Sequence, residues 1–558
     1  MPFAESAHVD TFARDNLPAE ADWPMLDFSL PDVQYPERLN AAAELLDRTI
    51  ERFGPDRVAF RTPDGQHWGV PGGEDDIWTY GELQHRVDQV ARLLTEDYGL
   101  VPGNRVLLRI PNNPWTAIVW LAVVKAGGIV VTTMVAWRHF EVEKIIRKVK
   151  PTLAVVDHRF LSEFRIAAPD LTTIVIGGRE DSLLKASGEK EGNFPAVDTA
   201  ADDVALLGPT SGTTGEPKVT MHFHRDVLAI ADTFAKHILK IQPDDVIAGS
   251  PPLAFTFGLG GLVIFPLRFG ASTLIIEQAK PGTLADAIDE KGVTVLFTAP
   301  TGYRTMLRQG RADSLRKLRV AVSAGEHLPK TTFEEVEREA GLRLIDGIGS
   351  TEMLHVFISA VAEEVVPGAT GKAIPGFRAT ILDDDGNEVP DGTPGHLAIV
   401  GPTGCRYLDD ERQRRYVKHG WNITGDTYIR DENGYFYYQA RSDDMIIASG
   451  YNVGAPEVEA AIDSHPSVVE SVVVGRPDPE KGAIVNAFIV LYPGVPEDDT
   501  TRESIKEVVR ERLATFKIPR RIDFVESLPR NPSGKLLRFP LRQRAEQEAA
   551  AEEAAKKG

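Results

Sequence analysis

Apolar runs alternate with amphipathic segments along the first part of the chain. Helical periodicity over 80–96 and 114–125 separates runs of strand length. These runs lie at 105–110, 129–133, 153–156 and 172–176. Such alternation is typical of stacked α/β layers with largely parallel sheets. The predicted fold class is therefore α/β.

A second series of strands ends in polar, glycine-bearing loops. After a helix predicted over 225–239, strands are predicted at 293–297, 318–322 and 342–345. Ligands of open α/β sheets bind beyond the carboxyl ends of the strands. The loops that begin at Ala299, Ser323 and Asp346 are therefore expected to converge on one site.

The pattern of apolar and polar residues changes twice along the chain. Residues 370–440 carry short β stretches with Asp-Gly turns, which indicates a small β-rich subdomain. From about 444 a compact α+β unit follows, with helices at 456–464 and 501–515 and strands at 468–475, 483–492 and 521–525. We predict a large N-terminal domain over 1–442, a small α+β domain over 443–540 and a charged tail over 541–558. The tail is expected to be a solvated helix or frayed.

Composition excludes several classes of protein. The chain has 558 residues, 42% of them hydrophobic and 26% charged, as in soluble globular proteins. The net charge of −20 argues against a nucleic-acid or anionic-membrane partner. A single cysteine, Cys405, excludes an internal disulfide and a cysteine metal cluster.

No targeting or membrane segment is expected. The first residues lack a basic region followed by an apolar core, so no export signal is visible. The apolar stretch at 116–137 is interrupted by Lys125, Gly127 and Gly128, which leaves pieces too short to span a bilayer. A buried helix followed by a buried strand is predicted there, and a cytoplasmic location.

The segment at 208–220 is the first candidate for chemistry. Apolar runs at 204–207 and 219–223 flank it, so it is predicted to be strand, loop and strand. Glycines, hydroxyls and one ammonium in so short a loop suit a polyphosphate. It differs from the Walker pattern, because Pro217 precedes Lys218 and a strand follows. By itself it could also be a surface turn.

Five motifs occur in one order along the chain. They are the 208–218 loop, Ser350-Thr351-Glu352, Thr424-Gly425-Asp426, Arg441-Ser442-Asp443-Asp444 and Pro529-Arg530-Asn531-Pro532-Ser533-Gly534-Lys535. Together they resemble the adenylate-forming superfamily of acyl- and aryl-CoA synthetases, adenylation domains and luciferases, over roughly residues 40–540. The strings at 323–326 and 346–355 resemble the benzoate-CoA ligase branch. The strings at 8–14 and 255–260 most resemble its 2-aminobenzoate members.

The resemblance implies an ATP-dependent aryl-CoA ligase with a mobile C-terminal domain. An aromatic carboxylate of the benzoate class and ATP would give an aryl-adenylate and pyrophosphate, and CoA would then displace AMP. The acid is expected to be ortho-substituted, as in 2-aminobenzoate or salicylate. ATP, CoA and Mg²⁺ are the implied cofactors, small molecules the implied partners, and a monomer or homodimer the implied assembly.

The same resemblance implies the site residues. Lys535, Thr351 and Glu352 would be catalytic, with Glu352 also binding Mg²⁺. ATP would be bound by Thr210, Ser211, Gly212, Thr213, Thr214, Gly215, Lys218, Gly325, Glu326, Asp346, Gly347, Ile348, Gly349, Asp426 and Arg441. The aryl acid would be bound by Phe255, Thr256, Phe257, Ala324, Gly325 and His355. Asp443 would be the hinge, and Ser449, Gly450 and Tyr451 would line the pantetheine tunnel.

Some departures and alternatives stay open. Ile348 stands where many relatives carry an aromatic residue against adenine, and Phe255 where many carry a gating histidine. His355 could be a core histidine bonded to backbone. Two other functions are an aryl-AMP ligase that loads a carrier protein and a non-catalytic nucleotide- or acyl-binding module.

Overall fold

A computed structural model describes residues 4–63, 77–210, 216–325, 328, 330–441, 445–448, 450–529 and 538–557. The chain forms two compact units. The larger unit comprises Met1–Val135, Ile146–Thr210 and Lys218–Ala440. The smaller unit comprises Ala136–Ile145, Ser211–Pro217 and Arg441–Gly558.

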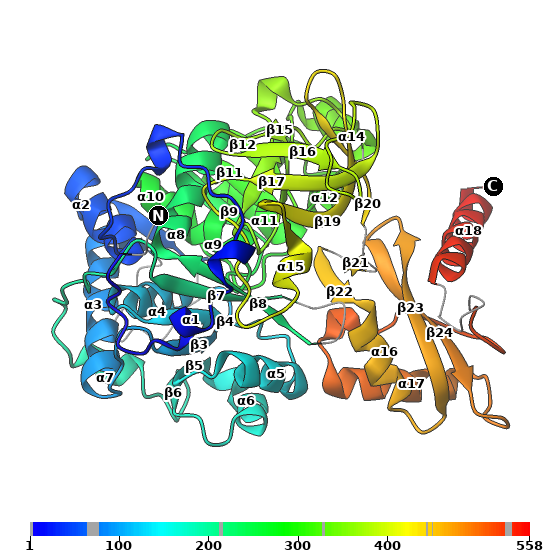
Figure 1. Ribbon diagram of the computed structural model, residues 1–558, viewed down its shortest axis with the longest axis horizontal. Coiled ribbons are helices and arrows are strands. Elements are labelled where there is room, and N and C mark those ends of the chain that lie inside the picture. Colours follow the sequence, from blue (N-terminus) through cyan, green and yellow to red (C-terminus); the bar gives the residue numbers. More distant parts are fainter. Residues whose placement is uncertain are drawn as a thin grey trace. The chain divides into compact units, whose positions relative to one another are not determined.

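A six-stranded sheet in the larger unit has the order β6-β5-β3-β4-β7-β8. Its strands are β3 (Arg105–Arg109), β4 (Ile129–Thr132), β5 (Leu153–Asp157), β6 (Thr173–Ile176), β7 (Val204–Thr210) and β8 (Lys218–Phe223). All neighbours are parallel except β7 and β8, as the alternating pattern predicted. Helices α3 (Tyr80–Glu96) and α4 (Pro114–Lys125) pack together near this sheet in Figure 1.

Helix α4 is apolar because it lies in the core. Every one of its residues is buried, and Asn113 caps it by accepting a hydrogen bond from the Thr116 amide. The predicted buried helix and strand at 116–137 are therefore confirmed. Among the residues that the structure describes, no helix combines the length and apolar character needed to cross a membrane.

A nine-stranded sheet has the order β15-β14-β13-β12-β11-β9-β10-β1-β2. Its strands are β1 (Val58–Arg61), β2 (Ile77–Thr79), β9 (Val246–Gly249), β10 (Ser272–Leu274), β11 (Val295–Thr298), β12 (Val320–Ser323), β13 (Ile345–Gly349), β14 (Val356–Ser359) and β15 (Lys372–Ala373). The strands from β13 to β1 are parallel, and Thr298, Ser323 and Asp346 are aligned across neighbouring strands. This register places the starts of the three loops side by side, and their convergence on one site stays a prediction.

Two predicted elements differ from the structure. The strand predicted at 342–345 is instead β13, because the backbone of Gly347 and Ile348 pairs with the returning strand β14. The helix predicted over 225–239 is α8 (His224–Ile230), which continues as a π-helix over Ala231–Leu239. Hydrophobic spacing alone does not distinguish these two helix types.

The β-rich subdomain forms as predicted. Its antiparallel strands are β16 (Arg378–Leu382), β17 (Gly395–Val400), β18 (Val417–Lys418), β19 (Trp421–Arg430) and β20 (Phe436–Arg441). The one-turn helix α15 (Gln413–Tyr416) precedes β18. A left-handed glycine, Gly386, shapes one of the predicted Asp-Gly turns with φ of 86°.

The smaller unit sandwiches a three-stranded sheet between helices. Its strands are β23 (Val468–Asp478), β24 (Gly482–Leu491) and β25 (Arg521–Phe524). Side chains alternate across β23, so Val473 joins the cluster under α16 (Ala455–Asp463) and α17 (Asp499–Arg512), while Val472 and Val474 face α18 (Arg538–Lys557). Figure 1 shows α16 and α17 on one side of the sheet and α18 on the other.

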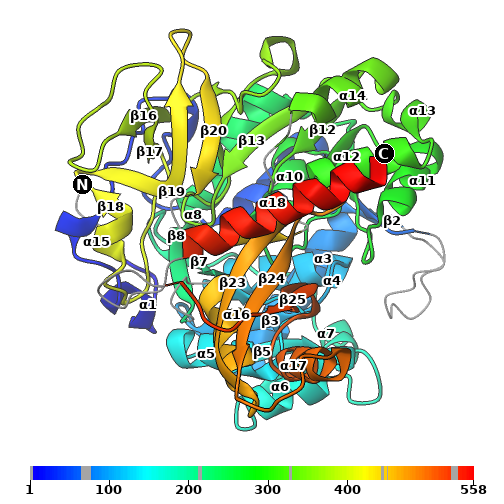
Figure 2. The ribbon, with the colours of Figure 1, turned by 90° about the vertical axis from the view of Figure 1, so that its right-hand side faces the viewer.

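The charged C-terminal tail contains helix α18, and only part of it is solvated. Leu541 and Ala545 are buried against β23 and β24, and the Glu548 carboxylate lies within 3.3 Å of the Arg476 guanidinium. Residues 550–555 are exposed. Figure 2 views α18 in front of β23 and β24. Helix α18 is therefore docked by two apolar residues together with ion pairs to Arg476 and Arg521.

Candidate active site

Strands β7 and β8 form the predicted strand–loop–strand unit. Thr210 and Lys218 pair at its open end. The Thr210 Oγ1 atom is buried and has no hydrogen-bond partner among the described residues. Ser211, Gly212, Thr213, Thr214 and Gly215 lie outside the described residues. The surface-turn alternative is weakened, because both flanking strands belong to the buried sheet.

Lys218 and Glu352 form an ion pair in the larger unit. The Lys218 Nζ atom lies 3.3 Å from Glu352 Oε1 and 3.0 Å from the Tyr407 hydroxyl. The Tyr407 hydroxyl also donates to Glu352 Oε1 at 2.5 Å. Burial alone would favour the neutral acid, but the Lys218 charge and the tyrosine hydrogen bond lower the pKa of Glu352. Glu352 is therefore an anion at neutral pH.

The turn that carries Thr351 and Glu352 packs directly on β7 and β8. A Cβ atom at Gly208 would lie 2.8 Å from Thr351 Cγ2, so only glycine permits this approach. The His222 Nε2 atom contacts the Thr351 carbonyl oxygen at 2.8 Å and Thr220 Oγ1 at 2.9 Å. Burial lowers the pKa of His222 to about 4, so its ring is neutral.

Sequence reasoning missed His222 and Tyr407. Neither belongs to the five ordered motifs, and both reach Thr351-Glu352 through contacts between segments distant in sequence. The sequence held a weak signal for His222: it is a polar residue between apolar Met221 and Phe223 in the alternating strand pattern that follows the loop. Nothing in the sequence pattern singled out Tyr407.

Asp346, the second residue of β13, lies beside Ser323 at the carboxyl end of β12. Both side chains are buried, and the Gly347 backbone and the Ser323 hydroxyl hydrogen-bond to the Asp346 carboxyl. Burial raises the pKa of Asp346 to about 8. Asp346 is therefore a neutral acid at pH 7, able to donate and accept hydrogen bonds. Gly347, Ile348 and Gly349 continue β13, and Gly325 is exposed just beyond β12.

The raised pKa of Asp346 predicts a pH dependence of stability. In the unfolded chain this carboxyl ionises near pH 3.8, whereas in the folded protein it ionises near pH 8. Between these values folding takes up a proton, so the contribution is fully present below the lower pKa and is lost as pH rises to about 8. Relative to Asp346→Asn, the parent's free energy of unfolding should fall by up to about 1.4 kcal/mol per pH unit between pH 5 and 8. Urea unfolding at several pH values measures this difference, and parallel curves for the two proteins over that range would contradict it.

His355 lies within a cluster of phenylalanine rings. Its ring centroid is 4.6 Å from Phe265 and 5.6 Å from Phe257, with Phe234 also within contact distance. Burial lowers the pKa of His355 to about 3, and a hydrogen bond to the Phe257 backbone offsets only part of that shift, as expected of a core histidine bonded to backbone. A Cβ at Gly260 would lie 2.4 Å from the ring, so glycine leaves it room. A neutral imidazole is thus held among aromatic rings beside the Phe257 backbone.

Three other residues predicted to bind the aryl acid are Phe255, Thr256 and Ala324. Phe257 belongs to α9 (Thr256–Leu259), and Phe255 directly precedes this helix. The Phe257 ring centroid also lies 5.7 Å from that of Phe297. Ala324 is buried at the end of β12. The structure therefore brings Phe257 and His355 together, and it places Phe255 and Thr256 at the start of the same short helix.

The remaining candidates lie on other segments of the chain, and Asp426 acts electrostatically on Tyr428, as Asp346 does. Asp426 is nearly buried on β19, where its amide donates to Thr424 Oγ1, and Arg441 ends β20. In the smaller unit Gly450 precedes β22 (Tyr451–Gly454), and the Tyr451 ring stacks on Phe516 at 4.3 Å. Glu326, Asp443, Ser449 and Lys535 lie outside the described residues.

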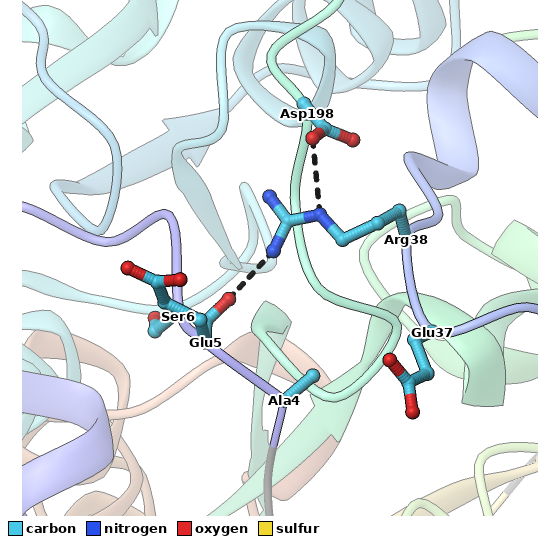
Figure 3. Close-up of a pocket in the computed structure, with 6 residues that line it drawn as sticks. All are labelled: Ala4, Glu5, Ser6, Glu37, Arg38 and Asp198. Atoms are coloured by element: carbon cyan, nitrogen blue, oxygen red, sulfur yellow. Dashed lines mark hydrogen bonds and ion pairs between the residues drawn. The ribbon is translucent and has the colours of Figure 1, made fainter.

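A surface pocket of about 440 Å³ is lined by a different set of residues. Figure 3 shows that Arg38 points between Glu5 and Asp198, donating to the Glu5 carbonyl at 2.6 Å and to Asp198 at 3.1 Å. Glu37 completes a mainly acidic rim. None of the predicted site residues lines this pocket, so it has no part in the candidate site.

The Lys218–Glu352 ion pair next to the predicted phosphate loop, and the aromatic cluster around His355, are features expected of an adenylate-forming enzyme. Residues 46–406 match the family model of AMP-binding enzymes, and residues 457–535 match the model of their C-terminal domain. The chain belongs to the AMP-binding enzyme family.

Individual relatives show to which branch of this family the chain is most similar. Benzoate–CoA ligase of Thauera aromatica is 33% identical over 525 residues, covering 92% of this chain and 97% of the relative. The 3-hydroxybenzoate–CoA ligase of Aromatoleum sp. (strain CIB) is 30% identical, covering 90% and 97%. A crystal structure of an anthranilate CoA ligase with anthranoyl-AMP superposes with a TM-score of 0.70 at 30% identity, covering 93% of this chain and all of that one. The chain thus groups with AMP-forming acid–thiol ligases of the benzoate–CoA ligase branch.

Proposed function

We propose that this enzyme is an aryl-CoA ligase that activates an ortho-substituted benzoate as its adenylate and transfers the aryl group to CoA. The observation that carries this proposal is the Lys218–Tyr407–Glu352 cluster at the base of the phosphate-suited loop, together with the aromatic cluster around His355. The first group suits ATP, and the second suits a flat ring.

The first half-reaction brings two anions together, so the site must offer positive charge and hydrogen-bond donors. The aryl carboxylate attacks the α-phosphorus of ATP, pyrophosphate leaves, and an aryl-adenylate forms. We assign Lys218 and the hydroxyl of Thr210 to the phosphates, and Lys535 to the α-phosphate and the acyl oxygen. Asp426 and Arg441 are assigned to the ribose, and the strand ends at Gly325 and Asp346–Gly349 to adenine.

The donor set around Glu352 fits Mg²⁺ brought in with ATP. Among the described residues no group of three or more histidine, cysteine or acidic side chains could hold a metal by itself. Mg²⁺ usually binds one or two carboxylates together with substrate phosphates, and Glu352 is an anionic carboxylate beside the phosphate loop. When bound, the ion would neutralise phosphate charge. Glu352 would hold it, and Thr351 would support that position.

The second half-reaction needs a different catalytic face. The CoA thiolate attacks the acyl carbon, and AMP leaves with the electron pair of the broken acyl–phosphate bond. We assign Ser449, Gly450 and Tyr451 to the pantetheine arm and Asp443 to the hinge that changes which face of the C-terminal domain meets the site. The assignments of Lys535 and Asp443 rest on the motif resemblance.

The ortho preference rests on His355 and Thr256. His355 is neutral and buried among phenylalanine rings, and an imidazole has two nitrogens, so the one that does not bond the Phe257 backbone offers a polar partner to an amino or hydroxyl group. A site built around such a partner rejects analogues that lack it more strongly than apolar walls reject a smaller ring. The 2-aminobenzoate-like segment at 255–260 adds Thr256 from the start of α9.

Replacing His355 tests this specificity. His355→Leu should lower the ratio of kcat/KM for 2-aminobenzoate to that for benzoate by about tenfold, because the ortho group loses its partner. Leucine suits the phenylalanine cluster, so the variant should fold. His396→Leu, which alters a histidine paired with Asp384 on β17, is the control and should keep the ratio. If His355→Leu and Thr256→Val both keep the parent ratio, the ortho group is recognised elsewhere.

A further inference from the structure

Tyr407 lies at the centre of the candidate site, although no motif contains it. Its hydroxyl donates to Glu352 Oε1 at 2.5 Å, and the same hydroxyl lies 3.0 Å from Lys218 Nζ. Lys218 in turn lies 3.3 Å from the same glutamate oxygen. A lysine and a tyrosine therefore share one oxygen of the carboxylate.

The backbone of β8 fixes the position of Tyr407. The Met221 amide donates to the Arg406 carbonyl at 2.7 Å, and the Leu408 amide donates to the Val219 carbonyl at 2.9 Å. Thr220 and Tyr407 face each other in this short bridge. The tyrosine is 1% exposed, and its ring meets Tyr416 edge-on at 5.8 Å. Its hydroxyl is therefore held by the same strand that carries Lys218.

The two donors on Glu352 differ in how easily they can leave. Lys218 carries its charge on a flexible four-carbon chain and is part exposed, so an arriving phosphate can attract it. The tyrosine hydroxyl sits on a rigid, buried ring and has no such freedom. A hydrogen-bond donor fixed on one carboxylate oxygen sets the rotation of the whole carboxylate. Residues that contact a metal or substrate keep their orientation through such hydrogen bonds from neighbouring groups.

We propose that Tyr407 is a positioning residue for the adenylation step: it holds Glu352 Oε1 so that the carboxylate keeps its orientation toward Mg²⁺-ATP when Lys218 moves to the phosphates. This inference rests on the proposed function, which assigns Glu352 to Mg²⁺. Tyr407 acts through Glu352 and does not itself contact the reacting atoms.

The test compares Tyr407→Phe with a matched loss of a buried hydroxyl. Tyr80→Phe is the control, because the Tyr80 hydroxyl is equally buried and donates to the Pro266 and Ala271 carbonyls of the core. Calorimetry measures the Kd of α,β-methylene-ATP, which cannot be cleaved at the α-phosphate, with EDTA and with Mg²⁺. In Tyr407→Phe the tightening produced by Mg²⁺ should shrink about tenfold, while the Kd in EDTA stays within about twofold of the parent. Tyr80→Phe should match the parent in both conditions.

Activity and a double variant complete the test. Pyrophosphate release by Tyr407→Phe should fall about tenfold or more, whereas thioester formation from supplied aryl-adenylate should change less than about threefold. If Tyr407 acts through Glu352, adding Tyr407→Phe to Glu352→Gln should cause little further loss.

Three results would overturn the proposal. One is an unchanged Mg²⁺ response in Tyr407→Phe, a second is equal weakening of nucleotide binding with EDTA and with Mg²⁺, and a third is additive losses in the double variant. A parent protein that binds the nucleotide tightly with Mg²⁺ but activates no acid would instead contradict the proposed function and leave the role of Tyr407 in nucleotide binding intact.

Discussion

Glu352→Gln should lower the rate of aryl-adenylate formation by about a hundredfold or more. The substitution removes the negative charge that the proposed function assigns to Mg²⁺, and the pKa of Glu352 is lowered in the parent so that this charge is present at neutral pH. The amide oxygen can still accept from Tyr407 and Lys218, so the fold should be retained. Pyrophosphate release with a saturating aromatic acid measures the effect.

Two further measurements separate this chemical role from a structural one. Glu364→Gln removes an exposed carboxylate elsewhere in the larger unit and should keep parent activity. Raising the Mg²⁺ concentration should recover part of the lost rate in Glu352→Gln, since weaker binding is offset by mass action. A Glu352→Gln enzyme with full adenylation activity would remove Glu352 from the catalytic residues.

Lys535→Ala should abolish adenylation while sparing the second half-reaction. A loss of about a thousandfold is expected, because the ammonium would stabilise charge that develops between the α-phosphate and the acyl oxygen. Thioester formation from supplied aryl-adenylate and CoA should stay within about threefold of the parent. Single-turnover assays of the two halves measure this split.

A lysine of the same domain provides the control for Lys535→Ala. Lys506 lies on α17, where it pairs with Glu503 at 2.8 Å, and Lys506→Ala should leave both half-reactions unchanged. Equal loss of the two halves in Lys535→Ala would mean that this lysine supports the structure of the domain or both reactions. Its assignment to adenylation would then be wrong.

The sequence predicted the elements well where an apolar run has the length of a buried strand or helix. The runs that became β3 to β6 are apolar on both faces, as strands of a covered parallel sheet must be, and α4 is buried all round. The order of the strands could not be predicted, because β1 and β10 pair across more than two hundred residues. The π-helix at Ala231–Leu239 follows from hydrogen-bond register, which hydrophobic spacing does not encode.

Residues of the candidate site could be predicted only where they belong to a recognisable sequence motif. Lys218 and Glu352 were identified from ordered motifs, and the structure pairs them. Tyr407 and His222 depend on strand contacts that only the folded chain creates. The neutral state of Asp346 also depends on the fold, because burial near the start of β13 raises its pKa to about 8. Composition gives no hint of such a shift.

CoA-dependent AMP formation tests the central claim most directly. The panel would contain benzoate, 2-aminobenzoate, salicylate, 4-hydroxybenzoate, phenylacetate and a fatty acid. The proposed function predicts that the ortho-substituted benzoates have the highest kcat/KM and that AMP release requires CoA. If an aromatic acid is adenylated without regard to CoA, the enzyme instead loads a carrier protein. If no acid supports AMP formation, the ligase assignment is wrong and the chain is a binding module.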